Sequence, residues 1–228
     1  MPSISVLIRL YNGIEFLEEA LDSVLEQTYK DFEVIIGVNG HGPDEKENHV
    51  LSKAQEIVNA KVDSRLIVKN YPNVKGGAEA LNALVADAKA EWVAILDVDD
   101  RWHREKLEYQ VFIRDTVTPS YDVIGTFCKY FGSFDGCPSI PHGHIHPDVF
   151  KTSNPMIHSS VILRKSLAQY TDFCSLDDYD LWCRLIQQGK RFYTIIAILT
   201  YHRLHNASHF NSSEKQDPLK LRNHYFPN

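Results

Sequence analysis

Three carboxylates lie within four residues in the stretch Asp97-Val98-Asp99-Asp100. Carboxylates this close raise one another's pKa unless a cation lies among them. Oxygen ligands suit a hard divalent ion such as Mg²⁺ or Mn²⁺, and such an ion commonly bridges the phosphates of a substrate. The stretch therefore predicts metal-assisted chemistry on a phosphorylated ligand. The alternative is a solvated acidic turn in which Asp100 caps the next helix.

The acidic stretch ends a regular alternation of strand-like and helix-like segments. Apolar runs typical of buried strands are followed by segments whose apolar residues recur at helical spacing. Strands are expected at 5–8, 32–38, 65–69 and 92–96, and helices at 14–27, 44–60 and 76–88. This order predicts an α/β fold: a Rossmann-like, doubly wound, mostly parallel sheet flanked by helices. Ligands bind beyond the carboxyl ends of such strands, so the tips at 9–12, 39–42 and 97–100 should converge.

The second half of the chain is less regular. The pattern predicts helices at 105–115 and 178–188 and strands at 123–130, 160–163 and 192–199, with Gly189 ending the second helix. Residues 133–155 are rich in Gly, Pro and His and indicate a long functional loop. No repeat or linker is evident, so we expect a single domain at 1–210 and a loosely held polar tail at 211–228.

Composition narrows the class of protein. The 228 residues are 43% hydrophobic and 24% charged, as in a soluble globular domain. The formal charge of −6 argues against nucleic acid as a partner, because phosphate neutralisation needs a basic surface. The longest uncharged stretch, 192–202, is shorter than the roughly 20 apolar residues of a membrane span. With no signal peptide at the start, we expect a cytoplasmic protein with reduced cysteines.

Several segments, taken in order, resemble family 2 glycosyltransferases of the GT-A fold. The matching segments are 6–13, 76–82, 94–102, Asn154-Pro155 with 158–160, 177–185 and 201–208. The resemblance extends over about residues 3–209. It implies an inverting enzyme that moves a hexose or deoxyhexose from a nucleoside diphosphate sugar, with a UDP-sugar as the expected donor. The implied acceptor is a hydroxyl group on a glycan or glycoprotein.

The resemblance implies roles for the acidic stretch and for the C-terminal segment. Asp97 and Asp99 match the family's D-x-D pair, in which Asp99 would ligate Mn²⁺ or Mg²⁺. Asp97 would hold the ribose or share the metal. His205 matches the position that approaches the metal or the diphosphate, and Arg203, two residues before it, is expected at the donor. Such a metal acts as a Lewis acid at the departing oxygen.

The resemblance also implies a general base. Asp178 matches the second residue of the family's Glu-Asp motif, with Asp177 and Asp180 as alternatives. Displacement of a diphosphate from C1 by an alcohol needs a carboxylate on the opposite face to accept the hydroxyl proton. A position at the start of a helix favours the ionised form of that carboxylate. The structural alternative is that an aspartate here only caps the helix.

The nucleotide-binding segments match the family less closely. Tyr11 matches the base-binding segment, but the second strand ends in Val38-Asn39 where the family commonly has two aspartates. An amide can still accept a hydrogen bond from uracil N3–H, so Asn39 is expected at the base. Arg9 replaces a usual proline and adds a cation near the phosphates. Gly76 and Gly77 either let the backbone approach the donor or form a simple turn.

Further features of the sequence leave alternatives open. The variant 39–42 is associated with enzymes of large DNA viruses that glycosylate their own capsids, which would place the protein in the host cytoplasm. His142, His144 and His146 alternate, so they could share a face and bind zinc, but flanking prolines favour a surface loop.

Two alternative functions also remain open. A sugar nucleotidyltransferase would have a more basic first loop than 9–13. A non-catalytic binding module would be expected to lack Asp99 or Asp178.

Overall fold

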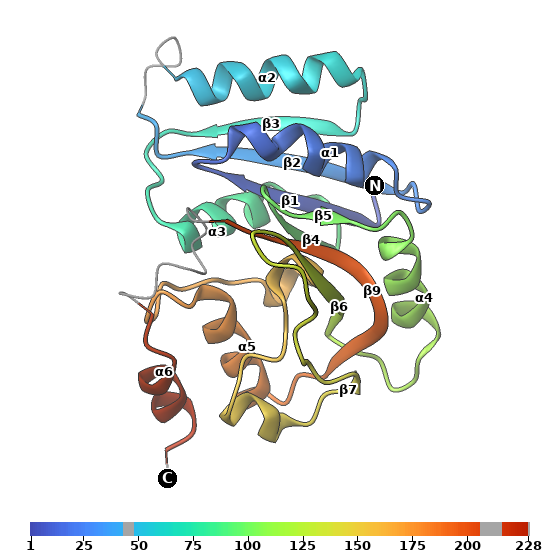
Figure 1. The fold of residues 1–228 in the computed structure, drawn as a ribbon, viewed down its shortest axis with the longest axis vertical. Helices are drawn as coiled ribbons and strands as arrows, with labels where there is room; N and C mark the ends of the chain where they lie inside the picture. The colour runs from blue at the N-terminus through green and yellow to red at the C-terminus, as the bar shows by residue number, and fades with distance from the viewer. Residues whose placement is uncertain (43–47, 206–215, 228) are drawn as a thin grey trace.

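One mixed β-sheet forms the centre of the protein. The computed structural model describes residues 1–42, 48–205 and 216–227. Within these residues nine strands form the sheet, in the order β3-β2-β1-β4-β8-β6-β9-β5, with β7 paired to β9 (Figure 1). The strands are β1 Ile4–Leu10, β2 Phe32–Asn39, β3 Leu66–Tyr71, β4 Trp92–Asp97, β5 Arg101–Trp102, β6 Val123–Gly132, β7 Gly143–His144, β8 Ile162–Arg164 and β9 Phe192–Leu204.

The first half of the sheet is parallel and the second half is mixed. Strand β1 pairs in parallel with β2 and β4, and β2 with β3. Strand β8 is antiparallel to β4 and β6, whereas β6 and β9 are parallel. Helices cover both faces of the parallel half, so β1 and β2 consist almost wholly of buried residues. The predicted α/β fold, a mostly parallel sheet flanked by helices, is confirmed.

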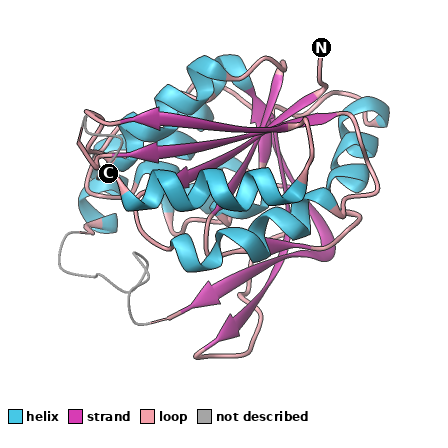
Figure 2. Cartoon of the chain, turned by 90° about the horizontal axis from the view of Figure 1, so that it is seen from above, coloured by secondary structure: helices cyan, strands magenta, loops and turns pink. Residues whose placement is uncertain are grey.

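The helices form two layers around the sheet (Figure 2). Helices α1, α2 and α4 pack on one face, and α3 and α5 on the other. Their bounds are α1 Leu17–Leu25, α2 His49–Lys61, α3 Gly77–Asp87, α4 Lys106–Thr116, α5 Asp177–Gln187 and α6 Pro218–Tyr225. Short 3-10 helices lie at η1 Ile14–Phe16, η2 Pro147–Lys151, η3 His158–Ser160 and η4 Lys165–Leu167. No helix in the described ranges is long and apolar enough to cross a membrane.

Strand alternation determines which polar side chains face the α3–α5 layer. In β1, Ile8 and Leu10 pack in the core cluster with α1, whereas Leu7 packs with α3 and α5. Side chains alternate between the two faces of a strand, and Arg9 follows Leu7 by two residues. The side chain of Arg9 therefore lies on the same face as Leu7, toward α3 and α5. The register pairs Arg9 with Asp97 of β4, so both side chains lie on the same face of the sheet.

The largest departures from the predicted elements lie near the C-terminus. Strand β9 extends to Leu204, five residues beyond the expected end, and its final residues pair with β5 and β6. Part of the predicted loose tail is instead helix α6, whose Leu221 is fully buried. The predicted domain boundary at 210 lies outside the described residues. Gly189 ends α5 in a left-handed conformation, as predicted (φ +71°).

Candidate active site

Asp97 ends β4 in a polar environment assembled from distant segments. Its Oδ2 accepts a hydrogen bond from Ser159 Oγ at 3.2 Å and lies 3.8 Å from Nδ1 of His158. The guanidinium of Arg9 lies 3.8 Å from Oδ1. Burial raises the pKa of Asp97, but the charges of His158 and Arg9 outweigh it and lower that pKa below its usual value. Asp97 is therefore an ionised carboxylate at the end of the parallel sheet.

Asp100 fastens the end of β9 to the acidic turn. The carboxylate is fully buried, accepts from the backbone N–H of Arg203 at 2.8 Å and contacts Nδ1 of His202 at 2.9 Å. Burial lowers the pKa of His202, yet the hydrogen bond and charge of Asp100 raise it to about 9. The alternative that Asp100 caps the next helix is wrong, because α4 begins at Lys106 with Glu105 as its N-cap.

Asp99 faces the residue that follows β9. Its Oδ2 lies 2.9 Å from Nε2 of His205, and its backbone carbonyl accepts from Nε of Arg203 at 2.9 Å. Arg203 also pairs with Glu19 of α1, and its guanidinium lies over the ring of Phe131 at 4.3 Å. Arg203, expected at the donor, thus supports the backbone of the acidic turn, and its role toward a donor stays a prediction.

The three predicted metal ligands do not form a closed site. In the described part of the chain, no group of three or more His, Cys, Asp or Glu side chains is arranged to hold an ion. A carboxylate oxygen of Asp99 and an imidazole nitrogen of His205 nevertheless lie within 2.9 Å of each other. Mn²⁺ accepts both donor types, and Mg²⁺ commonly takes only one or two carboxylates plus water and substrate phosphates. The donor set therefore fits a divalent ion whose remaining ligands come from the substrate.

Arg9 connects the acidic turn to the start of α5. Its Nη1 donates to Asp177 Oδ2 at 3.1 Å, while its other nitrogen faces Asp97. Burial lowers the pKa of Arg9, but the two carboxylates outweigh it and raise that pKa. Gly77 lies against the guanidinium, since a Cβ at this position would be 2.4 Å from Nη1. Gly76 is less restricted, because a Cβ there would meet only Glu79, at 3.7 Å or more.

The three candidate bases differ in their surroundings. Asp180 is completely buried and bound by Arg184, Tyr225 and Thr171, so it joins α5 to its neighbours. Asp177 forms the ion pair with Arg9.

Asp178 accepts from neutral donors, Asn154 Nδ2 at 2.9 Å and the N–H of Tyr179 at 2.7 Å. Burial raises the pKa of Asp178, and the charge of His158 opposes this. A raised pKa suits a proton acceptor.

The predicted base-binding segment forms an aromatic and amide surface. Tyr11 is half exposed and stacks on His41, with ring centroids 5.0 Å apart. Asn39 donates from Nδ2 to the carbonyl of Val74 at 3.3 Å, and its buried Oδ1 has no hydrogen-bond partner among the described residues. Gly40 has φ +77°, which brings the chain close under the Tyr11 ring. The tips at 9–12 and 39–42 thus converge as predicted, although His41 was not among the predicted site residues.

A second network missing from the sequence prediction lies behind Asp97. Nε2 of His158 is 3.2 Å from the hydroxyl of Tyr170, and Asn82 of α3 exchanges two hydrogen bonds with the Tyr170 backbone. Both His158 and Asn82 belong to the matching segments, but nothing in the sequence pairs them. The network holds η3, and with it Ser159, against the end of β4.

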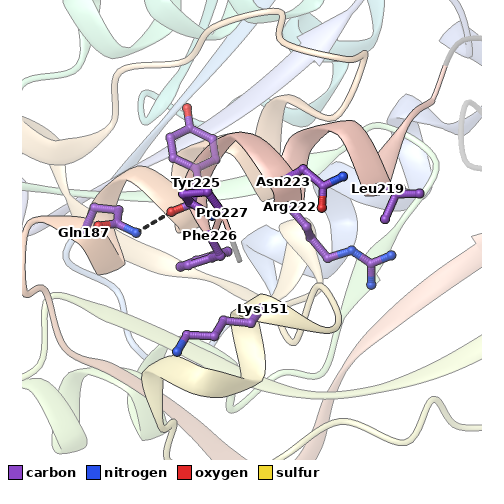
Figure 3. A pocket seen from close by; sticks show the side chains of 8 residues that line it. All are labelled: Lys151, Gln187, Leu219, Arg222, Asn223, Tyr225, Phe226 and Pro227. Carbon is purple, nitrogen blue, oxygen red and sulfur yellow. Dashed lines mark hydrogen bonds between the residues drawn. The ribbon is translucent and has the colours of Figure 1, made fainter.

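The alternating histidines and a surface cavity beside α6 lie outside this arrangement. His142 contacts Phe127 and His144 contacts Tyr121, whereas His146 caps η2, so the zinc alternative gains no support. A cavity of about 570 Å³ lies between η2 and α6 (Figure 3). None of its lining residues is a predicted site residue. Its two cations are already engaged, Lys151 with Asp148 and Arg222 with a backbone carbonyl.

Sequence comparison identifies relatives over most of the chain. Residues 5–154 match the family described as "Glycosyl transferase family 2". The chain is 28% identical over 218 residues to the UDP-Glc:alpha-D-GlcNAc-diphosphoundecaprenol beta-1,3-glucosyltransferase WfaP of Escherichia coli. That alignment covers 91% of this chain and 80% of WfaP.

Solved structures share the fold at lower identity. Residues 1–349 of S. aureus TarS in complex with UDP-GlcNAc superpose with a TM-score of 0.74 at 19% identity, over 93% of this chain and 61% of that one. The mannosyltransferase PcManGT from Pyrobaculum calidifontis, in complex with GDP-Man and Mn²⁺, superposes with a TM-score of 0.69 at 19% identity. That superposition covers 91% of this chain and 58% of PcManGT. The chain therefore has the GT-A fold and spans about three fifths of the length of these two structures.

Proposed function

The chain belongs to glycosyl transferase family 2, and we propose that it is a metal-dependent, inverting enzyme that transfers a sugar from a UDP-sugar to a hydroxyl acceptor on a glycan or glycoprotein. Family membership favours this function over the nucleotidyltransferase that the sequence left open. The observation that supports it most is the placement of Arg9. One guanidinium contacts both Asp97 and Asp177, so the acidic turn lies next to the first turn of α5.

The donor nucleotide would bind over the ends of β1 and β2. Tyr11 would stack on the base, and the unpartnered Oδ1 of Asn39 would accept from uracil N3–H. The orientation of the amide supports this assignment, because Nδ2 already donates to Val74. WfaP is named for UDP-Glc and TarS is bound to UDP-GlcNAc, which agrees with a uridine donor. PcManGT is bound to GDP-Man, so the fold alone does not select the base.

The diphosphate would lie over the acidic turn. Asp99 and His205 would hold the divalent ion, with Asp97 at the ribose or sharing the ion. When bound, that ion would neutralise the diphosphate as it leaves the sugar. Arg203 keeps the Asp99 backbone in place, and Asp100 keeps the end of β9, from which His205 follows, against the turn. Gly77, at the start of α3, would let the backbone approach the donor, whereas Gly76, where a Cβ would find ordinary contacts, would fit the alternative of a simple turn.

Asp178 would act as the general base. Its carboxylate would accept the proton of the acceptor hydroxyl while the hydroxyl oxygen attacks C1 of the donor sugar and the bond from C1 to the diphosphate breaks. A base and a leaving group on opposite faces of the sugar invert the configuration at C1. The raised pKa of Asp178 supports this role, because proton transfer is most efficient when the pKa of the base approaches the working pH.

A test of this function separates binding from chemistry. The protein and its Asp178→Asn variant are incubated with the donor and an acceptor, and the anomeric configuration of the product is determined by NMR. We expect inversion with the unchanged protein. In the variant, the rate should fall about 10²- to 10⁴-fold while UDP affinity stays the same. Unchanged transfer in the variant would exclude Asp178 as the base, and UDP binding without transfer by either protein would favour a non-catalytic binding module.

A further inference from the structure

The side chain of Asn154 reaches the carboxylate proposed as the general base. We infer that Asn154 is a positioning residue, whose amide orients the Asp178 carboxylate for proton acceptance. This inference rests on the proposed role of Asp178. Asn154 belongs to the segment between η2 and η3, which is separated from Asp178 by 24 residues along the chain.

Both oxygens of the Asp178 carboxylate are fixed by hydrogen bonds. Oδ1 accepts from the N–H of Tyr179 at 2.7 Å, and Oδ2 accepts from Nδ2 of Asn154 at 2.9 Å. The two contacts restrict rotation of the carboxylate about its Cβ–Cγ bond. A carboxylate offers about four lone-pair positions, so each oxygen retains capacity to accept a proton from an acceptor hydroxyl.

The orientation of the Asn154 amide is determined by its surroundings. Its Oδ1 accepts from the N–H of Met156 at 3.3 Å, which directs the NH₂ group toward Asp178. The segment is anchored on both sides of Asn154. The carbonyl of buried Phe150 accepts from the hydroxyl of Tyr179 at 2.5 Å. Met156 is buried against Gly125, where a Cβ would lie 2.6 Å from the Met156 methyl group.

The amide opposes the effect of burial on Asp178. Burial raises the pKa of Asp178, the charge of His158 and the Asn154 hydrogen bond lower it, and the neighbouring charge of Asp177 raises it. Tyr170, Tyr179 and Cys183 are further titratable groups that interact with Asp178. Loss of the amide donor removes one of the interactions that favour the ionised form, so the base would become protonated at a higher pH.

Two substitutions at this position separate positioning from packing. Asn154→Ala removes the donor, and Asn154→Asp keeps the shape but places a second carboxylate beside the first. The pH dependence of kcat is measured for both. We expect the acidic limb to move up by about one pH unit in Asn154→Ala and further in Asn154→Asp, because two adjacent carboxylates share a proton. Gln187→Ala is the matched control, since it removes an amide hydrogen bond at the other end of α5.

The outcomes distinguish this inference from the proposed function. If Asp178→Asn abolishes transfer while both Asn154 variants keep the wild-type pH profile, Asn154 has no positioning role and the base assignment stands. If Asp178→Asn transfers sugar at the wild-type rate, the proposed function fails and the inference with it. Melting temperatures show whether each variant is folded. Should Asn154→Ala not fold, Asn154→Leu, which keeps much of the volume but has no donor, is measured in its place, and an unchanged pH profile in that variant would overturn the inference.

Discussion

Nε2 of His205 lies 2.9 Å from Oδ2 of Asp99, although the two residues are 106 positions apart. The contact depends on the long strand β9, which brings the residue after Leu204 to the turn after β4. Asp100 secures the same junction through the Arg203 backbone. A nitrogen and an oxygen donor are thereby placed together before any ligand arrives.

We expect His205→Ala to weaken the binding of Mn²⁺ in the presence of UDP. Loss of a residue that only orients a metal ligand typically lowers metal affinity about 10- to 100-fold, so loss of a ligand should cost at least as much. Isothermal titration of Mn²⁺ into the UDP complex measures the change. His146→Ala is the control, because His146 caps η2 and contacts Asp148, away from the acidic turn. Equal affinities for the wild type and His205→Ala would remove His205 from the metal site.

Adjacent glycines provide a matched pair of substitutions. A Cβ at Gly77 would overlap Nη1 of Arg9, whereas a Cβ at Gly76 would find ordinary contacts. Because the guanidinium is the end of a flexible chain, Gly77→Ala should displace Arg9 from Asp177 without unfolding the protein. We expect transfer to fall several-fold in Gly77→Ala and to stay near wild type in Gly76→Ala, with similar melting temperatures. A similar loss of activity in both variants would contradict a specific role for the Arg9–Asp177 ion pair.

Asn39 should select the base of the donor. Uracil offers a donor at N3, whereas cytosine offers an acceptor there, so the free Oδ1 should favour UDP over CDP. Asn39→Leu keeps much of the volume but removes the acceptor. We expect UDP affinity to fall about tenfold, equivalent to roughly 1.4 kcal/mol, and the preference over CDP to disappear. Calorimetry with both nucleotides is the measurement, and an unchanged preference would exclude Asn39 from base recognition.

The His202–Asp100 pair should make stability depend on pH. The pKa of His202 is raised from 6.5 to about 9, so its contribution is complete below about pH 6.5 and is lost as the pH rises through 9. At about 1.4 kcal/mol per unit, the contribution is up to roughly 3 kcal/mol. Urea unfolding of the wild type and His202→Asn, in EDTA at several pH values, should show a stability difference that shrinks toward pH 10. A difference that is constant with pH would contradict the ion pair.

The parallel half of the fold could be predicted because its signals are local. Strands β1, β2 and β4 are short apolar runs that are buried on both faces, and α1 and α3 show apolar residues at helical spacing. Strand β9 was predicted too short because its last residues are polar and are held by pairing with β5 and β6. Helix α6 was missed for a related reason. It is polar, and Leu221 is its one fully buried residue within the described positions 218–225.

The candidate site was predicted as a set of residues but not as a set of contacts. Strand ends and motif resemblance predicted four of the site residues, namely Asp97, Asp99, Asp178 and Asn39. The sequence could not pair Arg9 with Asp177, because that contact depends on how α5 lies over the sheet. The interactions of His41 and Asn154 were missed for the same reason, since each joins segments that are distant along the chain.

The most direct test of the central claim is donor hydrolysis. The protein and its Asp99→Ala variant are incubated with a panel of nucleotide sugars, first with Mn²⁺ and then with EDTA, and the release of the nucleoside diphosphate is followed. We predict slow hydrolysis of one UDP-sugar by the wild type, lost with EDTA and in Asp99→Ala. Hydrolysis that is unaffected by either EDTA or Asp99→Ala would contradict a metal-dependent transferase that acts through this acidic turn.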